Sequence, residues 1–322
     1  MPSETLPEVN GGRAIPAWTY VGGLILISGL VIVVLARLVI SLRSLGAEQE
    51  TAATQIVTPG SVISKETDAD TYKAWGLASL KREGYKQAIA DLSKAIRIAP
   101  DDAEAYYHRA RAAFLMGDYQ SALPDLNQAI GLRADYAEAY YYRGATYAVL
   151  TSYDRAIADY GSAIALVTEF PDAYHQRGRA FFMQAKLDQA ILDYTRALEL
   201  RPDFVECVYD RGIAYLSREG YVAAEEDFSA AIARMPDWGE AYYWRGNARF
   251  RQQKFSQARK DYDRAIALMS DHAASYHARG LTHRRLGNEE EAIADFEQVL
   301  AKTLGPNLLA GAKAQLEEMR RE

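Results

Sequence analysis

Residues 171–204 read PDAYHQRGRAFFMQAKLDQAILDYTRALELRPDF, and this stretch decides the fold because its key positions recur every 34 residues. Gly178 is one of seven small residues at that spacing, which are Gly76, Ala110, Gly144, Gly178, Gly212, Gly246 and Gly280. Twelve residues after each of them stands an alanine, at Ala88, Ala122, Ala156, Ala190, Ala224, Ala258 and Ala292. A large apolar residue follows four positions later, at Leu92, Leu126, Tyr160, Tyr194, Phe228, Tyr262 and Phe296. Seven periods without an insertion therefore cover residues 69–306.

Each period predicts two amphipathic helices joined by a short turn. Apolar and small residues recur at intervals of three and four in two runs, which is the spacing of one helix face. The Gly or Ala of the first run is expected where the second helix crosses most closely. A large apolar residue marks the turn in six periods, at Tyr85, Tyr119, Tyr153, Leu187, Tyr221 and Phe255, and Glu289 takes that place in the last. Pro100, Pro202 and Pro236 stand where second helices are expected to end.

The period and its order of aromatic, glycine, aromatic, alanine, aromatic, alanine and proline resemble the tetratricopeptide repeat. The resemblance covers residues 69–306 and implies an all-α fold, a right-handed superhelical solenoid of seven helix-turn-helix repeats. Residues 307–322 are expected to form a capping helix. Its apolar residues fall on one face, namely Leu308, Leu309, Ala312, Leu316 and Met319.

The resemblance also implies an inner, concave surface that is lined by the first helix of each repeat and binds other proteins. Carried over to this sequence, the candidate partner-binding residues are Lys73, Tyr107, Arg111, Phe114, Tyr141, His175, Arg179, Phe182, Tyr209, Tyr243, Asn247 and Phe250. Aromatic rings beside arginine and asparagine can hold an extended or helical peptide. Packing is the alternative role for each tyrosine. The four candidates that depart from the generic pattern of the family are stronger, and they are Arg111, His175, Arg179 and Asn247.

Two further rows carry opposite charges at the same period. Arginine precedes the small residue in six periods, at Arg109, Arg143, Arg177, Arg211, Arg245 and Arg279, with Trp75 in the first. Aspartate recurs in the second helix, at Asp91, Asp125, Asp159, Asp193, Asp227, Asp261 and Asp295. Strict matching of both signs favours a ladder of ion pairs within the scaffold, and a row that binds partners is the alternative.

Several functions are excluded or disfavoured by the sequence. The net charge of −6 argues against nucleic-acid binding, which needs a basic face. The family's clamp for the carboxylate of chaperone tails is absent, since Lys73 is followed by Leu77 and not by the required asparagine. No GxxxxGK[ST], HExxH or GxSxG motif occurs, and the spacing of His272, His277 and His283 does not suit a metal site. We therefore expect no enzyme activity and no cofactor. Cys207 is the only cysteine and is expected to pack as a small residue.

The N-terminal part predicts a membrane anchor. Residues 14–36 carry no charge, and 23 residues at about 1.5 Å each could cross a hydrocarbon core of about 30 Å. A buried core helix and a cleaved signal peptide are the alternatives. Arg37 and Arg43 follow the span while Arg13 alone precedes it, so the repeats are expected to be cytoplasmic. The predicted organisation is a tail (1–13), an anchor with its basic flank (14–43) and a flexible linker (44–68) before the repeats.

Together these features predict a single-pass membrane protein that acts as a scaffold or assembly factor. Its expected partners are other proteins, as peptides or helical segments bound in the concave groove, and the membrane through residues 14–36. The alternative is a permanent structural subunit of a membrane protein complex, in which the partner does not exchange.

Overall fold

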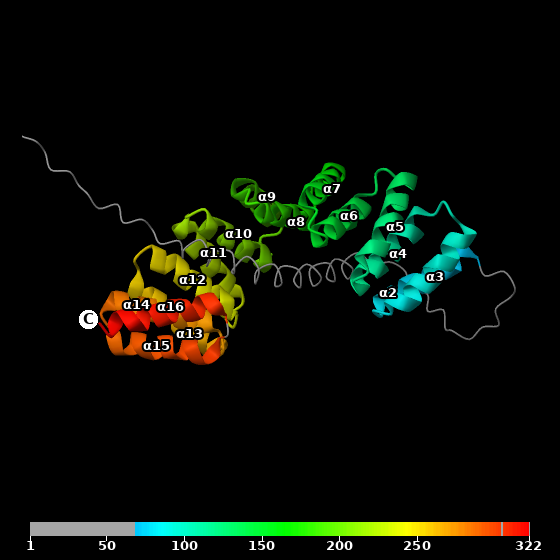
Figure 1. The fold of residues 1–322 in the computed structure, drawn as a ribbon. Coiled ribbons are helices and arrows are strands. Elements are labelled where there is room, and N and C mark those ends of the chain that lie inside the picture. The colour runs from blue at the N-terminus through cyan, green and yellow to red at the C-terminus, as the bar shows by residue number, and fades with distance from the viewer. Residues whose placement is uncertain (1–67, 304, 322) are drawn as a thin grey trace, which may run out of the picture.

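The computed structural model describes residues 68–303 and 305–321. This part of the chain is built of α-helices arranged as seven consecutive hairpins, followed by one further helix (Figure 1). The first helices of the hairpins are α2 (Ala69–Lys81), α4 (Ala103–Met116), α6 (Ala137–Val149), α8 (Pro171–Met183), α10 (Val205–Ser217), α12 (Gly239–Arg251) and α14 (Ala273–Leu286). The second helices are α3 (Tyr85–Ile98), α5 (Tyr119–Leu132), α7 (Tyr153–Leu166), α9 (Leu187–Leu200), α11 (Tyr221–Arg234), α13 (Phe255–Leu268) and α15 (Glu289–Lys302). The last helix is α16 (Pro306–Met319).

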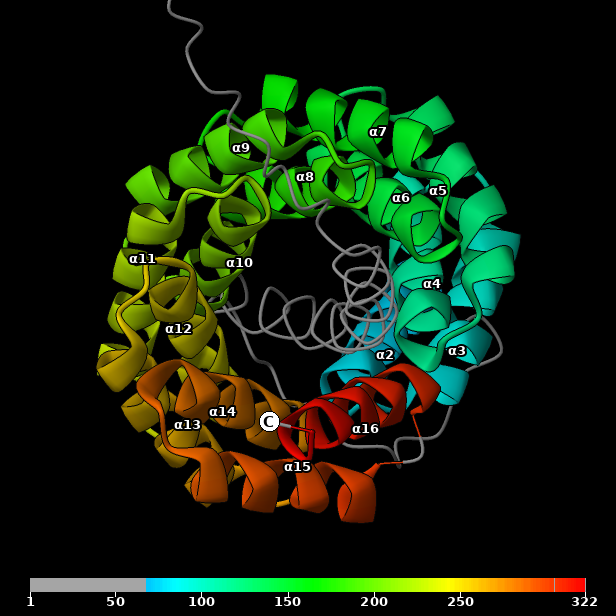
Figure 2. The ribbon, with the colours of Figure 1, turned by 60° about the vertical axis from the view of Figure 1, so that its left-hand side comes forward.

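The hairpins stack side by side into a curved solenoid with an inner and an outer layer. Viewed along its axis, the first helices form the inner wall and the second helices the outer wall (Figure 2). The predicted all-α solenoid of helical hairpins is therefore confirmed. Its core lies between the two layers, where the periodic alanines of the second helices, from Ala88 to Ala292, are completely buried.

The turn inside each hairpin uses one residue with a left-handed backbone. This residue is the fifteenth of its repeat, and it is Glu83, Gly117, Thr151, Ala185, Glu219, Gln253 or Gly287. Only two of the seven are glycine, the residue that adopts a positive φ without steric cost. At the starts of first helices, Asp68 and Asp102 cap free backbone N–H groups with their side chains.

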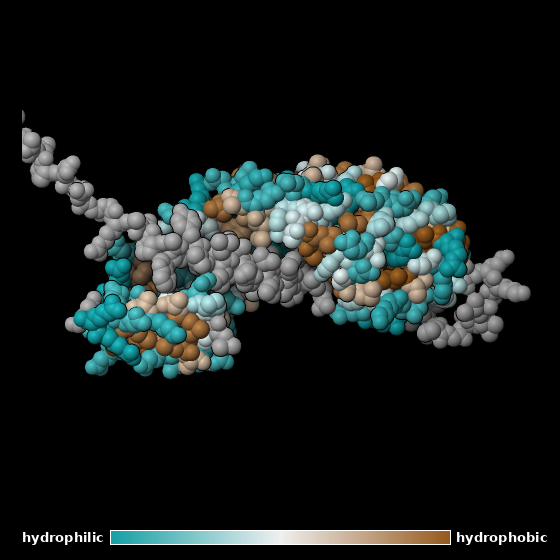
Figure 3. Space-filling model, in the orientation of Figure 1, coloured by the Kyte–Doolittle hydropathy of each residue, from teal (hydrophilic) through white to brown (hydrophobic). Residues whose placement is uncertain are grey.

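Helix α16 closes the C-terminal end of the core. Its Ala312 and Leu316 are buried in one cluster with Phe296 and Val299 of α15. A salt bridge of 2.9 Å joins Arg284 of α14 to Glu318 of α16. The face seen in Figure 3 is mostly hydrophilic, with separate hydrophobic patches.

The localisation predicted from the sequence, a single-pass membrane protein with cytoplasmic repeats, is corrected by the structure. Within residues 68–303 and 305–321, no helix has the length and apolar character needed to cross a membrane. Each helix there has 13 or 14 residues, or about 20 Å at 1.5 Å per residue, whereas a crossing needs about 20 residues. The predicted tail, anchor and linker of residues 1–67 lie outside the described residues.

Candidate functional site

The twelve predicted partner-binding residues lie on first helices, which form the inner wall of the solenoid (Figure 2). Five of them are buried rings at the fifth position of their repeats, namely Tyr107, Tyr141, His175, Tyr209 and Tyr243. Each ring packs against the ring that ends its own repeat, and the centroid distances are 4.4–5.1 Å. The partner rings are Tyr136, Phe170, Phe204, Trp238 and His272. Each partner ring directly precedes the first helix of the next repeat. This row therefore joins successive repeats, and its period of 34 residues was a signal available in the sequence.

His175 and Arg179 are held inside the scaffold by a carboxylate of the next repeat. His175 Nε2 lies 2.8 Å from Asp210 Oδ2, and Arg179 Nε lies 3.7 Å from the same oxygen. Both side chains are buried, and Arg179 is 6% exposed. The two residues bind neighbouring helices together, and sequence reasoning missed Asp210 as their shared partner.

The other predicted residues of the N-terminal and central repeats also make contacts within the scaffold. Lys73 Nζ lies 2.9 Å from Oδ2 of Asp102, the residue that caps the first helix of the next repeat. Phe114 is buried in the core, and Phe182 packs against two core clusters. Arg111 is half-buried, and its guanidinium forms a hydrogen bond with Tyr142.

The Arg–Asp ladder is a structural feature of the hairpins. In six repeats the arginine of the first helix forms at least two hydrogen bonds with the aspartate sixteen residues later, as Arg177 does with Asp193 at 2.8 Å each. Arg109, Arg211 and Arg245 also donate to a Ser or Thr hydroxyl of the preceding repeat. The prediction of a self-complementary ladder is thus confirmed.

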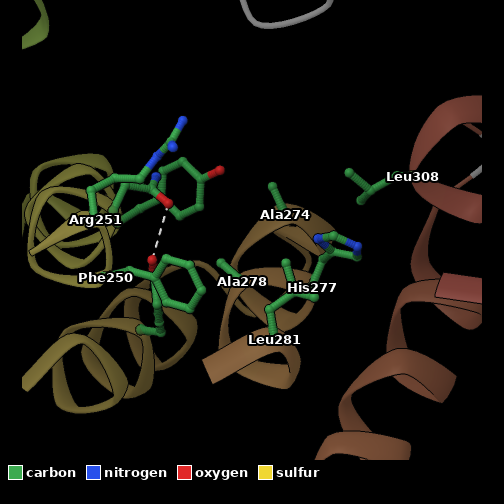
Figure 4. Close-up of a pocket in the computed structure, with 10 residues that line it drawn as sticks. Phe250, Arg251, Ala274, His277, Ala278, Leu281 and Leu308 are labelled. Carbon is green, nitrogen blue, oxygen red and sulfur yellow. Dashed lines mark hydrogen bonds between the residues drawn. The ribbon is translucent and has the colours of Figure 1, made fainter. Parts of the chain in front are cut away.

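A pocket of about 200 Å³ opens on the inner face between α12, α14 and the start of α16 (Figure 4). Its wall is formed by Tyr243, Asn247, Phe250 and Arg251 of α12, Tyr262 of α13, Ala274, His277, Ala278 and Leu281 of α14, and Leu308 of α16. Three of the predicted residues, Tyr243, Asn247 and Phe250, thus meet at one site.

Small residues on α14 leave the space for this pocket. Its Ala274 and Ala278 occupy the second and sixth positions of the last repeat. The second position carries Asp or Glu in the other six repeats, at Asp70, Glu104, Glu138, Asp172, Glu206 and Glu240. The sixth position carries a larger side chain in repeats two to six, at His108, Tyr142, Gln176, Asp210 and Trp244. This local loss of side-chain volume was visible in the sequence, but the wall supplied by Leu308 requires knowledge of how α16 packs.

The polar groups of the pocket differ in charge and in orientation. The Tyr262 hydroxyl donates to Asn247 Oδ1 at 3.0 Å, which fixes the asparagine side chain in the wall (Figure 4). Burial lowers the pKa of His277, so its imidazole is neutral at pH 7. Arg251 is exposed at the rim, on the side opposite His277 and Leu308 (Figure 4), and it forms no ion pair with any residue that the structure describes. Sequence reasoning did not select Arg251 or Leu308.

No cluster of side chains suited to a metal ion occurs within residues 68–303 and 305–321. The arrangement of the pocket instead offers apolar walls, one fixed amide and one exposed guanidinium. These groups can bury a side chain of a ligand and form hydrogen bonds with its polar neighbours.

Comparisons with known proteins agree with this architecture. Models described as tetratricopeptide repeat match residues 103–136, 171–204, 209–268 and 239–302, and one described as TPR repeat matches residues 76–117. Comparison with curated protein sequences finds no match.

Solved structures with this fold include the C-terminal part of a TPR repeat-containing protein from Cytophaga hutchinsonii, with 20% identity and a TM-score of 0.61 over 74% of this chain and 98% of that one. A tetratricopeptide repeat protein from Parabacteroides merdae has 19% identity and a TM-score of 0.55 over 78% of this chain and 98% of its own. YrrB, described as a TPR protein with an unusual peptide-binding site, has 24% identity and a TM-score of 0.54 over 58% of this chain and 97% of its own. At sequence identities of 19–24%, the similarity to these structures shows the fold alone.

Proposed function

The chain belongs to the tetratricopeptide repeat family, and on that premise we propose that it is a scaffold for protein–protein interactions whose inner face binds a segment of a partner protein. Solenoids of this kind present long concave surfaces to their partners. The description of YrrB as a peptide-binding TPR protein supports this class of ligand.

The pocket between α12, α14 and α16 is the observation that carries the proposal. Elsewhere on the inner wall the predicted residues are largely occupied by contacts within the scaffold, as with His175 and Arg179 on Asp210. The pocket, by contrast, leaves an open volume of about 200 Å³ that the rings of Tyr243 and Phe250 line. A side chain buried in such a pocket is the type of contact that dominates the affinity of a protein interface.

A partner captured through one buried side chain would exchange, as expected of an adaptor or assembly factor. Short peptide segments with a few dominant contacts usually dissociate much faster than large, permanent interfaces. The scaffold is therefore proposed to hold its partner transiently, with the rest of the inner wall providing shape complementarity.

Filling the pocket tests this function. Ala274 lies at the pocket wall and is half-exposed, so Ala274→Trp should occupy the space with little disturbance of the hairpin. In crosslinking and mass spectrometry of the full chain in its native cells, the variant should lose partners that the unchanged protein captures. Ala90→Trp is the matched control, since Ala90 is exposed on the outer helix α3. Equal capture by all three proteins, with unchanged melting temperatures, would reject the pocket as the binding site.

A further inference from the structure

The size and walls of the pocket define the side chain that it can hold. A cavity of about 150 Å³ lined by apolar side chains accommodates benzene, whereas sites for cofactors and drug-sized ligands span about 300–1,000 Å³. At about 200 Å³, the pocket fits one ring and not a cofactor. Tyr243, Phe250 and Tyr262 line it with aromatic surfaces, which favour edge-to-face packing against another ring.

The charges around the pocket define what should lie next to that ring. None of its ten lining residues is a carboxylate, because the acidic second position of the repeat is Ala274 here. Arg251 stands at the rim, and Arg285, one period later at the same position of the repeat, is also exposed. Neither arginine forms an ion pair within the described part of the chain. The equivalent residues of repeats two to five are uncharged, namely Leu115, Val149, Met183 and Ser217.

A third arginine nearby is already engaged by the scaffold. Arg284 Nη1 lies 2.9 Å from Glu318 Oε2 and donates to Gln315 Oε1, both on α16. This pairing holds α16 against α14, so that Leu308 completes the pocket wall. The same contact zone includes Gly311, where a Cβ would lie 3.2 Å from His277 Nε2. Positive charge is thus available to a ligand at Arg251, which lines the pocket, and the exposed Arg285 follows one period later on α14.

We propose that this pocket recognises partner segments in which an aromatic residue is adjacent to an aspartate or glutamate. The aromatic ring fills the space between Tyr243, Phe250 and Leu308, and the neighbouring carboxylate meets the guanidinium of Arg251. This inference rests on the proposed function and specifies its ligand. The repeats before the pocket carry carboxylates at their second positions, and Glu138 and Glu206 form no ion pair with a described residue, so an acidic segment is repelled there and directed to the C-terminal repeats.

Three fluorescein-labelled octapeptides of matched length test the proposal by fluorescence polarisation with the full chain. The first has a phenylalanine between two aspartates, the second has the same phenylalanine between two lysines, and the third has alanine between two aspartates. The first should bind at least about tenfold more tightly than the third, because burial of a ring contributes about 1.5–3 kcal/mol. It should also bind about two- to fivefold more tightly than the second, since an exposed ion pair contributes up to about 1 kcal/mol.

Variants of the rim give the decisive comparison. Arg251→Glu should reverse the preference, so that the lysine-flanked peptide binds more tightly than the aspartate-flanked one. Arg97→Glu on the outer helix α3 is the control, since Arg97 is also exposed and forms no ion pair with a described residue, and it should leave the order unchanged. Raising the salt concentration should reduce the difference in affinity between the aspartate-flanked and lysine-flanked peptides. It should leave the difference between the phenylalanine and alanine peptides unchanged.

The outcomes separate this inference from the proposed function. If the three peptides bind equally, or if Arg251→Glu leaves their order unchanged, the aromatic–acidic specificity is wrong. If Ala274→Trp nevertheless abolishes capture of cellular partners, the pocket still binds proteins and only its ligand was misassigned. If Ala274→Trp leaves capture intact while the peptides also fail to bind, both the site and its ligand are wrong.

Discussion

Gly178 of α8 lies directly against the ring of Tyr194 of α9, so that a Cβ at position 178 would come within 2.8 Å of Tyr194 Cε1 and 3.2 Å of the Ala190 carbonyl oxygen. The same relationship recurs two and three periods later, where a Cβ at Gly246 would lie 2.7 Å from the Tyr262 ring and one at Gly280 would lie 2.9 Å from the Phe296 ring. Contacts this short leave no room for a methyl group. The glycine therefore sets how closely the two helices of a hairpin approach.

Replacing this glycine should destabilise the solenoid locally. Gly178→Leu forces α8 and α9 apart, at a cost on the order of 1–3 kcal/mol or more. Because repeat arrays are stabilised by each repeat and its neighbours, hydrogen exchange should increase first in the fourth repeat and the adjacent ones. Gly131→Ala is the control, since nothing lies within 4 Å of a Cβ there, and it should raise the stability of α5 slightly. An unchanged melting temperature for Gly178→Leu would contradict this account of the crossing.

Most of the fold follows from the sequence because one spacing determines both helices of each repeat. The small residue, the alanine and the large apolar residue each contact one another in the hairpin, as Gly178, Ala190 and Tyr194 do, so their joint period fixes the register. The Arg–Asp ladder follows for the same reason. In both cases the partners stand at a constant separation of sixteen residues or fewer.

The site could be predicted only in part. Tyr243, Asn247 and Phe250 were found because the first helices line the inner face. Arg179 was selected for its unusual charge, but its role depends on Asp210, and repeat spacing alone does not reveal that pairing. The pocket itself depends on α16, which lies beyond the repeats and brings Leu308 opposite Arg251. The repeat period predicts contacts between helices that belong to the repeats. It does not predict how a helix outside the repeats packs against them.

A second prediction concerns the turn residue with a left-handed backbone. Thr151 has a φ of 59° and is exposed, and a β-branched residue in this region is strained by about 1–2 kcal/mol. Thr151→Gly should therefore stabilise the chain by about 0.5–1 kcal/mol after the entropy cost of glycine. Urea unfolding should measure the gain. The reverse change at the equivalent position, Gly117→Thr at a φ of 88°, should destabilise the chain. If Thr151→Gly also lowered the stability, the backbone at Thr151 would not be strained.

A third prediction concerns the Arg–Asp ladder. Asp193 is almost fully buried and accepts two hydrogen bonds from Arg177, so Asp193→Asn leaves the guanidinium facing an amide with one oxygen and no charge. We expect a loss of about 1–3 kcal/mol in the free energy of unfolding. The matched change is Asp91→Asn in the first repeat, where Trp75 replaces the arginine and the partners are Gln87 and the more exposed Lys94. That variant should lose less free energy of unfolding. Equal losses in the two variants would mean that the pairing of aspartate with arginine adds no stability.

The fourth prediction uses the pH dependence of Glu225, which joins α11 to α12 and to the turn that follows it. Its carboxylate accepts from Arg249 Nε at 2.9 Å, and from Gln252 Nε2 and Lys254 Nζ at 2.8 Å. Burial alone would raise the pKa of Glu225, but these hydrogen bonds outweigh burial and lower its pKa from 4.5 to about 2.

Since the pKa of Glu225 is lower in the folded state than in the unfolded state, the unfolded chain binds more protons between about pH 4.5 and pH 2. The stabilisation is therefore complete above about pH 4.5 and is lost as the pH falls through 2.

The variant Glu225→Gln tests this pH dependence. Its free energy of unfolding at pH 7 should be about 1–3 kcal/mol lower than that of the unchanged chain, and this difference in free energy should narrow between pH 4.5 and pH 2. Urea titrations at pH 7, 4 and 2.5 measure it. Glu297→Gln, at an exposed carboxylate of α15 with no ion pair to a described residue, is the control and should leave the free energy of unfolding at pH 7 nearly unchanged. A difference for Glu225→Gln that stays constant from pH 7 to pH 2.5 would show that its charge does not hold the two repeats together.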